Sequence, residues 1–339
     1  MGSATVKDVA MRAGVSTATV SRVISGSVNV SQELSERVKN AAKELDYYPN
    51  VIARSLKTDS TSTIAYIVSD ISNAAFTAMA KAIEDIIEPK GYMLLMCSTD
   101  HKSEKERRYL RLAQEKKVEG IIINTTGKNN ALVASMSQRI PMVLSNRRVD
   151  EEGFHGDFVD NDNYDGAFSL TKHLIELGHR RIGAINGDLS LSTGRERYAG
   201  HLEALRKYGL AGEGASAYMY EGYFSAQDGY RGGEYLMSLS EPPTAIVVMN
   251  NEMLIGALRF FREAGIQIPQ NLSVVSYGNI VYRDLFYVQP TYATLDPASI
   301  GKRLGELLVE RIDKKNELAN REVRFVPHLV LGNSTAPLE

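Results

Sequence analysis

The chain has 339 residues, more than one compact core usually covers, so two or three domains are expected. Its 43% hydrophobic and 24% charged residues are ordinary for a globular protein, and no apolar run approaches the length of a membrane span. The single cysteine, Cys97, excludes an internal disulfide, and the N-terminus carries no apolar signal segment. Together these features predict a cytoplasmic protein.

The first 60 residues contain patterns of short helices and no strand. A first helix follows Thr5, whose hydroxyl can cap it, and Gly14 suits a turn that needs a positive φ angle. A second helix follows Ser16, and a third follows Ser31. The apolar residues that fall at helical spacing in these segments are Val6, Val9, Ala10, Ala13, Val20, Val23, Ile24, Leu34, Val38, Ala41, Ala42 and Leu45.

Two short helices joined by a three-residue turn form a helix-turn-helix, whose second helix enters the major groove of DNA. On the outer face of that helix, Arg22 could bond a guanine, while Thr17 and Ala18 could contact a thymine methyl group. Candidate donors to phosphates are Thr5, Ser16, Thr19, Ser21, Asn29 and Ser31. Residues 1–60 carry eight Lys and Arg against six Asp and Glu, which permits DNA binding without arguing for it. A small helical cap with solvated polar residues is the alternative.

Residues 47–60 link this segment to the rest of the chain. Pro49 ends the third helix, and Asn50 can cap a helix over 51–57 that is too short to be stable alone. Such a helix would present Arg54 to DNA, and an exposed Leu56 could act as an apolar wedge in the minor groove. From these residues alone, an ordinary linker with Leu56 packed on the body is the better explanation of the segment.

From Ser62 onward, apolar strands alternate with amphipathic helices. The predicted strands are 64–69, 92–98, 119–124, 141–145, 156–160, 181–186, 245–249 and 272–277, with helical patterns such as 77–91, 165–178 and 252–265 between them. This alternation predicts parallel sheets built from βαβ units, and there are too many units for one small sheet. We therefore expect an α/β body of two lobes with a ligand cleft between them.

Six segments carry a distinctive pattern: TVKDVAMRAGVSTATVSRVISG (5–26), LDYYPNVIARSLKT (45–58), VEGIIIN (118–124), HLIELGHRRIGAINGD (173–188), GRERYAGHLEAL (194–205) and PTAIVVMNNEMLIGALRFFREAGIQIPQNLSVVSYGN (243–279). They resemble the lactose repressor/galactose repressor (LacI/GalR) family, and the first is most similar to its purine-repressor and catabolite-control members. The resemblance implies a homodimeric repressor that binds a pseudo-palindromic operator and responds to a small, sugar-like effector. It also implies that two hinge helices pair through Ala53 and insert Leu56 into the minor groove.

The resemblance further implies a periplasmic-binding-protein-like body whose lobes are joined by three crossovers near residues 160, 290 and 322. The expected boundaries are a helix-turn-helix domain at 1–46, a hinge at 47–60 and an effector-binding and dimerisation domain at 61–339. Within that domain we expect an N-terminal lobe of 61–160 with 292–322 and a C-terminal lobe of 161–291 with 323–339. The effector residues implied by the family pattern are Asn73, Phe76, Asn146, Arg197, Phe224, Asn250 and Asn279.

Three positions depart from the family pattern. Asn146 and Asn251 stand where aspartate is usual, and Gly278 replaces the carboxylate that accepts hydrogen bonds from vicinal sugar hydroxyls. Hydrogen bonds to a charged group contribute about 1.5–3 kcal/mol each, so their loss should weaken binding of an ordinary neutral sugar. Because Arg197 is retained, the pattern favours an anionic ligand such as a phosphorylated or carboxylated sugar.

Other classes of function are less consistent with the sequence. No GxGxxG, P-loop, HExxH, GxSxG or CxxC motif occurs, so we expect no enzyme activity, no cofactor and no metal site. A ligand-carrying transport protein would not need residues 1–58. A regulator that is controlled by a partner protein, as in the catabolite-control branch, remains the main alternative, and a small molecule that alone changes operator affinity would exclude it.

Overall fold

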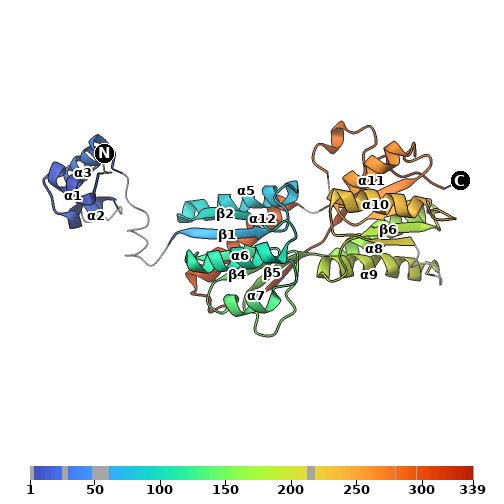
Figure 1. The fold of residues 1–339 in the computed structure, drawn as a ribbon, viewed down its shortest axis with the longest axis horizontal. Coiled ribbons are helices and arrows are strands. Elements are labelled where there is room, and N and C mark those ends of the chain that lie inside the picture. The colour runs from blue at the N-terminus through green and yellow to red at the C-terminus, as the bar shows by residue number, and fades with distance from the viewer. Residues whose placement is uncertain are drawn as a thin grey trace. The chain divides into compact units, whose positions relative to one another are not determined.

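A computed structural model of the chain describes residues 4–24, 30–47, 61–211, 218–278, 280–294 and 296–338 (Figure 1). The chain divides into two compact units, Met1–Thr61 and Ser62–Glu339. The predicted hinge residues Asn50, Ala53, Arg54 and Leu56 lie outside the described residues, as do Asn29 and Asn279.

The first unit contains the three predicted helices, α1 (Val6–Ala13), α2 (Thr17–Ile24) and α3 (Gln32–Glu44). Thr5 caps α1 in a reciprocal capping box with Asp8, and Gly14 ends the helix with a left-handed φ of 65°. The Arg37 guanidinium donates to the Ala13 carbonyl at 2.6 Å and so ties α3 to the turn. The buried core joins all three helices and comprises Val9, Ala10, Ala13, Val20, Val23, Val38 and Ala41.

The second unit begins with a six-stranded, wholly parallel sheet in the order β11-β5-β4-β3-β1-β2. Its strands are β1 (Thr63–Val68), β2 (Met93–Ser98), β3 (Gly120–Ile123), β4 (Met142–Ser145), β5 (Asp157–Asn161) and β11 (Glu322–Phe325). The helices of this lobe are α5 (Ala74–Ile87), η1 (Glu88–Lys90), α6 (Ser103–Glu115), α7 (Asn130–Ser137) and α12 (Pro297–Asp313). Alternate residues of β1 enter opposite cores: Ile64 and Tyr66 pack with α5 and α12, whereas Ala65 and Ile67 pack with α6 and α7.

The other lobe contains the sheet β12-β10-β9-β8-β6-β7, in which β10 and β12 pair antiparallel and the remaining pairs are parallel. Its strands are β6 (Ile182–Asn186), β7 (Met219–Glu221), β8 (Ala245–Val248), β9 (Ser273–Tyr277), β10 (Thr291–Thr294) and β12 (His328–Val330). Its helices are α8 (Asn163–Glu176), α9 (Ser192–Lys207), α10 (Ala226–Met237), α11 (Asn251–Glu263) and η3 (Arg283–Leu285). Figure 1 shows α10 and α11 on one face of this sheet and α8 and α9 on the other.

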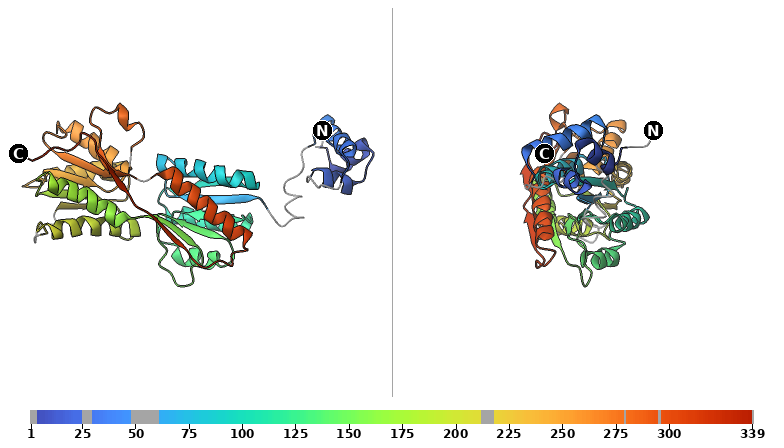
Figure 2. Two further views of the ribbon diagram at one scale, coloured as in Figure 1. Left: turned by 180° about the vertical axis from the view of Figure 1, so that it is seen from behind. Right: turned by 90° about the vertical axis from the view of Figure 1, so that its left-hand side faces the viewer.

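Three crossovers join the lobes: between β5 and α8, between β10 and α12, and between β11 and β12 (Figure 2). All eight predicted strands form, each within one or two residues of its expected ends. The second and third crossovers fall later than the expected residues 290 and 322, because β10 (TYAT) and β11 (EVRF) continue each sheet to Thr294 and Phe325. These strands are short and partly polar, so no apolar run marks them.

A buried ion pair lies at the start of β5, at the end of the first lobe that is away from the crossovers. Arg311 of α12 donates to both oxygens of the Asp157 carboxylate, at 2.9 and 2.8 Å, and both side chains are fully buried. Arg321 also binds Asp157, and the remaining Arg311 donors reach the carbonyls of Leu318 and Ala319. The guanidinium therefore joins α12, β5 and the segment that leads into β11.

We expect Arg311→Met to lower the free energy of unfolding of the body by about 3–5 kcal/mol, because it removes one partner of a buried ion pair. Chemical unfolding measured by circular dichroism tests this. Arg303→Met, on the same helix but in a partly exposed pair with Glu306, is the matched control and should cost less than about 1 kcal/mol. Equal losses in the two variants would show that Arg311 contributes no more than a surface ion pair.

Candidate functional site

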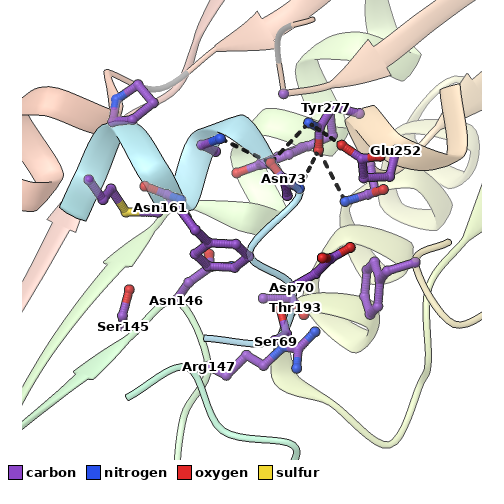
Figure 3. Close-up of a pocket in the computed structure, with 18 of the residues that line it drawn as sticks. Ser69, Asp70, Asn73, Ser145, Asn146, Arg147, Asn161, Thr193, Glu252 and Tyr277 are labelled. Carbon is purple, nitrogen blue, oxygen red and sulfur yellow. Dashed lines mark hydrogen bonds between the residues drawn. The ribbon is translucent and has the colours of Figure 1, made fainter. Parts of the chain in front are cut away.

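A cleft between the two lobes is lined by residues that follow the carboxyl ends of parallel strands. Asp70 follows β1, Arg147 follows β4 and Gly278 follows β9. The cleft has a volume of about 930 Å³ including its open mouth. In Figure 3, Asn73 lies near Glu252 and Tyr277, whereas Arg147 lies at the other end of the view, near Ser69 and Thr193. This is the position at which open α/β sheets bind ligands.

Two asparagines bridge the lobes across the cleft. The side-chain amides of Asn73 and Asn251 donate to each other, each at 3.2 Å. Asn73 caps α5 of the first lobe, Asn251 begins α11 of the second, and Asn250 caps α11 through the Met253 amide at 3.0 Å. Because Asn251 is an amide where the family pattern has a carboxylate, it can both donate and accept in this pair.

Arg197 of α9 is buried at the wall of the cleft. Its Nε donates to Asn163 Oδ1 at 2.8 Å, its Nη1 donates to the Met249 carbonyl at 2.6 Å, and the guanidinium lies 3.8 Å from the centroid of the Tyr277 ring. Burial lowers the pKa of Arg197 and raises the pKa of Tyr277. Two hydrogen bonds and the Tyr277 ring therefore hold the side chain at the wall of the cleft.

Phe224 and Arg147 form a second wall. Phe224 has a left-handed φ of 66°, and a Cβ atom on Gly187 would lie 2.0 Å from its ring, so the ring requires glycine at that position. The Arg147 guanidinium is 5.4 Å from the ring centroid, and its Nη1 donates to the Thr125 carbonyl at 2.9 Å. Burial, with the nearby positive charge of Arg197, lowers the pKa of Arg147 to about 10.

Several buried polar atoms of the cleft lining have no hydrogen-bond partner in the described structure. They include Arg147 Nε, Asn161 Oδ1 and Thr193 Oγ1. A buried polar group without a partner costs about 1–3 kcal/mol, which a polar ligand would recover. One donor, one acceptor and one hydroxyl match a ligand that is rich in hydroxyl groups.

The cleft contains six of the seven residues that the sequence singled out for effector contact. Asn73, Phe76, Asn146, Arg197, Phe224 and Asn250 all line it, and their contact with a ligand remains a prediction; Asn279 lies outside the described residues. Sequence reasoning missed Ser69, Asp70, His101, Ser145, Arg147, Asn161, Thr193, Glu252 and Tyr277. Many of these stand at or just after strand ends, and that position is the signal that could have found them.

The missed residues change the charge of the site. Asp70 and Glu252 supply two carboxylates to a lining that also contains the Arg147 and Arg197 guanidinium groups. Burial, with the nearby Asp70 charge, raises the pKa of Glu252. The expectation of an anion-binding cleft counted only positions 146, 251 and 278, so it overlooked acidic side chains that come from other elements.

The helix-turn-helix residues form a separate candidate site on the first unit. Ser16, Thr17, Ala18, Ser21 and Arg22 are exposed on α2 and the turn before it, as the helical spacing predicts. The side chain of Thr19 is partly buried and bonds Ser16 Oγ at 3.0 Å.

The hydroxyls of Thr5 and Ser31 cap their helices, Thr5 bonding Asp8 and Ser31 accepting from the Leu34 amide. The exposed side chains on the outer face of α2 are the candidates for contact with DNA. Over the ranges that the structure describes, no helix is long and apolar enough to cross a membrane. The same ranges hold no group of three or more His, Cys, Asp or Glu side chains that could bind a metal ion.

The chain combines a three-helix unit that has an exposed helix-turn-helix with a two-lobed α/β body that has a polar cleft. This combination defines a ligand-responsive DNA-binding regulator. Comparison with known protein families supports this class. Residues 5–50 match bacterial regulatory proteins of the lacI family, and residues 61–327 match the periplasmic binding proteins and sugar-binding domain of the LacI family. The chain belongs to the LacI family and is a DNA-binding transcriptional repressor with an effector-binding domain.

Individual relatives extend over the whole chain. The HTH-type transcriptional repressor PurR of Aliivibrio salmonicida is 33% identical over 99% of this chain and 100% of its own length. PurR of Erwinia tasmaniensis is 35% identical over 98% of this chain and 97% of its own. These relatives are transcriptional repressors, not enzymes.

Two solved structures also align over nearly the whole chain. A lac repressor dimer bound to operator and the anti-inducer ONPF has a TM-score of 0.84 at 25% identity, covering 99% of this chain and all of that one. The CelR–cellobiose complex has a TM-score of 0.72 at 26% identity, covering 98% of this chain and 99% of that one.

Asp160, at the first crossover, is a buried carboxylate connected to the cleft. Its Oδ1 accepts from Asn163 Nδ2 at 3.1 Å, and the same asparagine holds Arg197, whereas Asp160 Oδ2 has no partner in the described structure. Burial raises the pKa of Asp160 from 3.8 to about 7. Between pH 3.8 and about pH 7, the Asp160 carboxyl group is protonated in the folded chain but ionised in the unfolded chain. The contribution of Asp160 to stability therefore falls as the pH rises through this range.

We expect Asp160→Asn to remove this pH dependence. The stability of the variant relative to the wild type should rise between about pH 4 and pH 7 and then level off, with a total change on the order of a few kcal/mol. Urea unfolding of both proteins across that range measures it. Asp150→Asn, which changes an exposed carboxylate, is the control. A stability difference that does not vary with pH would contradict the assignment.

Proposed function

We propose that the chain acts as a cytoplasmic homodimer that binds a pseudo-palindromic operator, and that a sugar or sugar derivative in the interlobe cleft controls its affinity for DNA. The observation that carries the effector proposal is the cleft lining: Arg147, Asn161 and Thr193, each with a buried atom that has no protein hydrogen-bond partner, line the same cleft as the buried Phe224 ring. Polar groups that converge next to an aromatic face are typical of a small-molecule site.

The balance of charges in the cleft supports a neutral ligand over an anion. The carboxylates of Asp70 and Glu252 can accept hydrogen bonds from sugar hydroxyls, which is the role left vacant at Gly278. A phosphate or carboxylate group would meet these carboxylates as well as the two guanidinium groups. Neutral sugars are therefore the first candidates, and sugar phosphates are the comparison.

Exposed apolar side chains support dimerisation of the body. On the second lobe, a groove beside α11 is lined by Ile255, Val281 and Phe286, which are all exposed. On the first lobe, Met93 and Leu95 are exposed on β2, the edge strand of its sheet. Apolar surface of this kind marks protein interfaces, and a twofold dimer would bury the same patch on both copies.

The proposed coupling runs through the body. A ligand that contacts both lobes favours one lobe arrangement, because Arg147 belongs to the first lobe and Arg197 and Phe224 to the second. The Asn73–Asn251 amide pair is a direct side-chain link between the lobes within the cleft, and such a ligand would strengthen or displace it. A differential binding energy of about 1–3 kcal/mol would change operator affinity about 5- to 150-fold.

We expect a neutral sugar to change operator affinity in the wild-type protein and to have a much smaller effect in Arg197→Gln. Operators selected from random DNA provide the probe, and fluorescence anisotropy with neutral sugars and sugar phosphates provides the measurement. Arg206→Gln, an exposed arginine on the same helix that pairs only with Glu203, is the matched control. If only sugar phosphates act, the neutral-ligand proposal fails; if no small molecule acts alone, control by a partner protein replaces it.

Arg22→Ala should reduce discrimination between operator sequences more than it reduces non-specific binding. A bidentate contact with guanine contributes about 1–3 kcal/mol of discrimination, whereas phosphate contacts act on every sequence alike. The ratio of affinities for the selected operator and for random DNA at one salt concentration measures this. Lys7→Ala, in α1, is the comparison; an equal loss of discrimination in both variants would count against base reading by Arg22.

A further inference from the structure

Asp160 lies at the first crossover, between groups of both lobes. It belongs to β5 of the first lobe and is 1% exposed. Its Oδ1 accepts a hydrogen bond at 3.1 Å from Nδ2 of Asn163, the residue that begins α8 of the second lobe. Within the first sheet, Asp160 is in register with Arg324 of β11, the strand that leads into the third crossover. The carboxyl group is therefore held between two of the three segments that join the lobes.

The amide group of Asn163 has more acceptors around it than it has hydrogens to donate. Its Nδ2 lies 3.1 Å from Asp160 Oδ1, 3.1 Å from the Asn161 carbonyl oxygen and 3.4 Å from Glu196 Oε2. An amide nitrogen has two hydrogens, so it cannot satisfy all three acceptors fully. Asp160 Oδ2 has no partner in the described structure. If both side chains were ionised, two negative charges would share one donor, and a proton on Asp160 relieves that repulsion.

Charged and titratable groups face Asp160 from each of the elements around it. They are Glu196 and Arg197 of α9, Arg324 of β11, Tyr277 of β9, and Asp162 in the same crossover. The Arg324 guanidinium is already paired with Glu322 at 2.7 Å. Burial, with the nearby Glu196 charge, raises the pKa of Asp160 to about 7 in spite of the two arginines. Near neutral pH, small changes around the carboxyl group therefore change its charge.

The groups that surround Asp160 belong to different lobes. Arg324 is part of the first sheet, whereas Asn163, Glu196 and Tyr277 are part of the second lobe. A change in lobe arrangement must therefore change the burial of the Asp160 carboxyl group or its distances to these neighbours. Because burial and neighbouring charges set proton affinity, two lobe arrangements would bind the proton with different affinities. The proton then stabilises the arrangement that binds it more tightly.

We propose that operator binding by this protein is coupled to proton binding by Asp160 at the first crossover. The lobe arrangement of this structure buries the carboxyl group and favours its protonated form. An arrangement that admits water to the crossover, or that moves Glu196 away, favours the ionised form. The pH then acts on operator affinity in addition to the effector. This proposal rests on the proposed coupling between lobe arrangement and operator affinity, and it does not depend on the identity of the effector.

The test is the pH dependence of operator affinity for the full chain without effector. Operators selected from random DNA provide the probe. Fluorescence anisotropy at constant ionic strength, between about pH 5.5 and about pH 8.5, provides the measurement. None of the six histidines lies in residues 1–60, so the helix-turn-helix unit contributes no histidine titration. We expect operator affinity to change up to about tenfold for each linked proton, which corresponds to a pKa difference of about one unit, and this change to be lost in Asp160→Asn.

Two further variants separate Asp160 from other causes. Asp165→Asn changes an exposed carboxylate in the first turn of α8, so it is the matched control and should keep the wild-type pH dependence. Glu196→Gln removes the neighbouring negative charge, so the midpoint of the pH dependence should move to lower pH. Isothermal titration calorimetry in two buffers of different ionisation enthalpy counts the protons exchanged on operator binding. That number should differ between the wild type and Asp160→Asn, and not between the wild type and Asp165→Asn.

The proposal is overturned if operator affinity of the wild type does not vary with pH, or if the same variation persists in Asp160→Asn. Circular dichroism checks that the variants fold; if Asp160→Asn does not, an unshifted midpoint in Glu196→Gln overturns the proposal instead. A neutral sugar that acts while the pH dependence persists in Asp160→Asn would leave the proposed effector function intact and exclude the proton coupling. The converse result, in which no sugar acts but Asp160→Asn loses the pH dependence, would support the proton coupling and contradict the effector function.

Discussion

The cleft depends on one constraint. The parallel strands of both sheets end where the two lobes face each other, and three crossovers hold the lobes together there. Asp70 and Arg147 reach the cleft because β1 and β4 end at it, and Tyr277 reaches it at the end of β9. Arg197 then connects the second lobe to the first crossover through Asn163, which in turn bonds Asp160. A change in lobe arrangement must therefore change the surroundings of these buried groups.

Buried polar groups explain how a small ligand could act on such a body. Arg147, Asn161 and Thr193 each have a buried atom with no protein partner among the described residues, and a buried polar group that stays unpaired costs about 1–3 kcal/mol. A ligand that pairs with them in one lobe arrangement recovers that free energy only in that arrangement. The resulting difference in binding free energy between the two lobe arrangements is of the size that allosteric coupling requires. The reciprocal Asn73–Asn251 pair offers a competing arrangement in which the lobes bond each other directly.

Much of the architecture could be predicted, because long apolar strands and amphipathic helices leave periodic patterns. The short strands β10 and β11 could not, since their side chains are partly polar. In addition, β11 pairs with β5, which is far away in the sequence. The same limit applies to the ion pair between Arg311 and Asp157, which joins residues separated by 154 positions. Nothing local to either residue indicates its partner.

The sequence by itself determined the helix-turn-helix, the two-lobed α/β class and most of the cleft residues that the family pattern marks. Helical spacing and capping residues act locally, so they can be interpreted from neighbouring positions. Only the tertiary structure decided the charge and extent of the cleft. Asp70, Arg147 and Glu252 come from three different elements, and the Phe224 ring reaches the cleft because Gly187 has no Cβ atom to block it. Convergence of this kind depends on chain topology, which residue patterns along one segment do not contain.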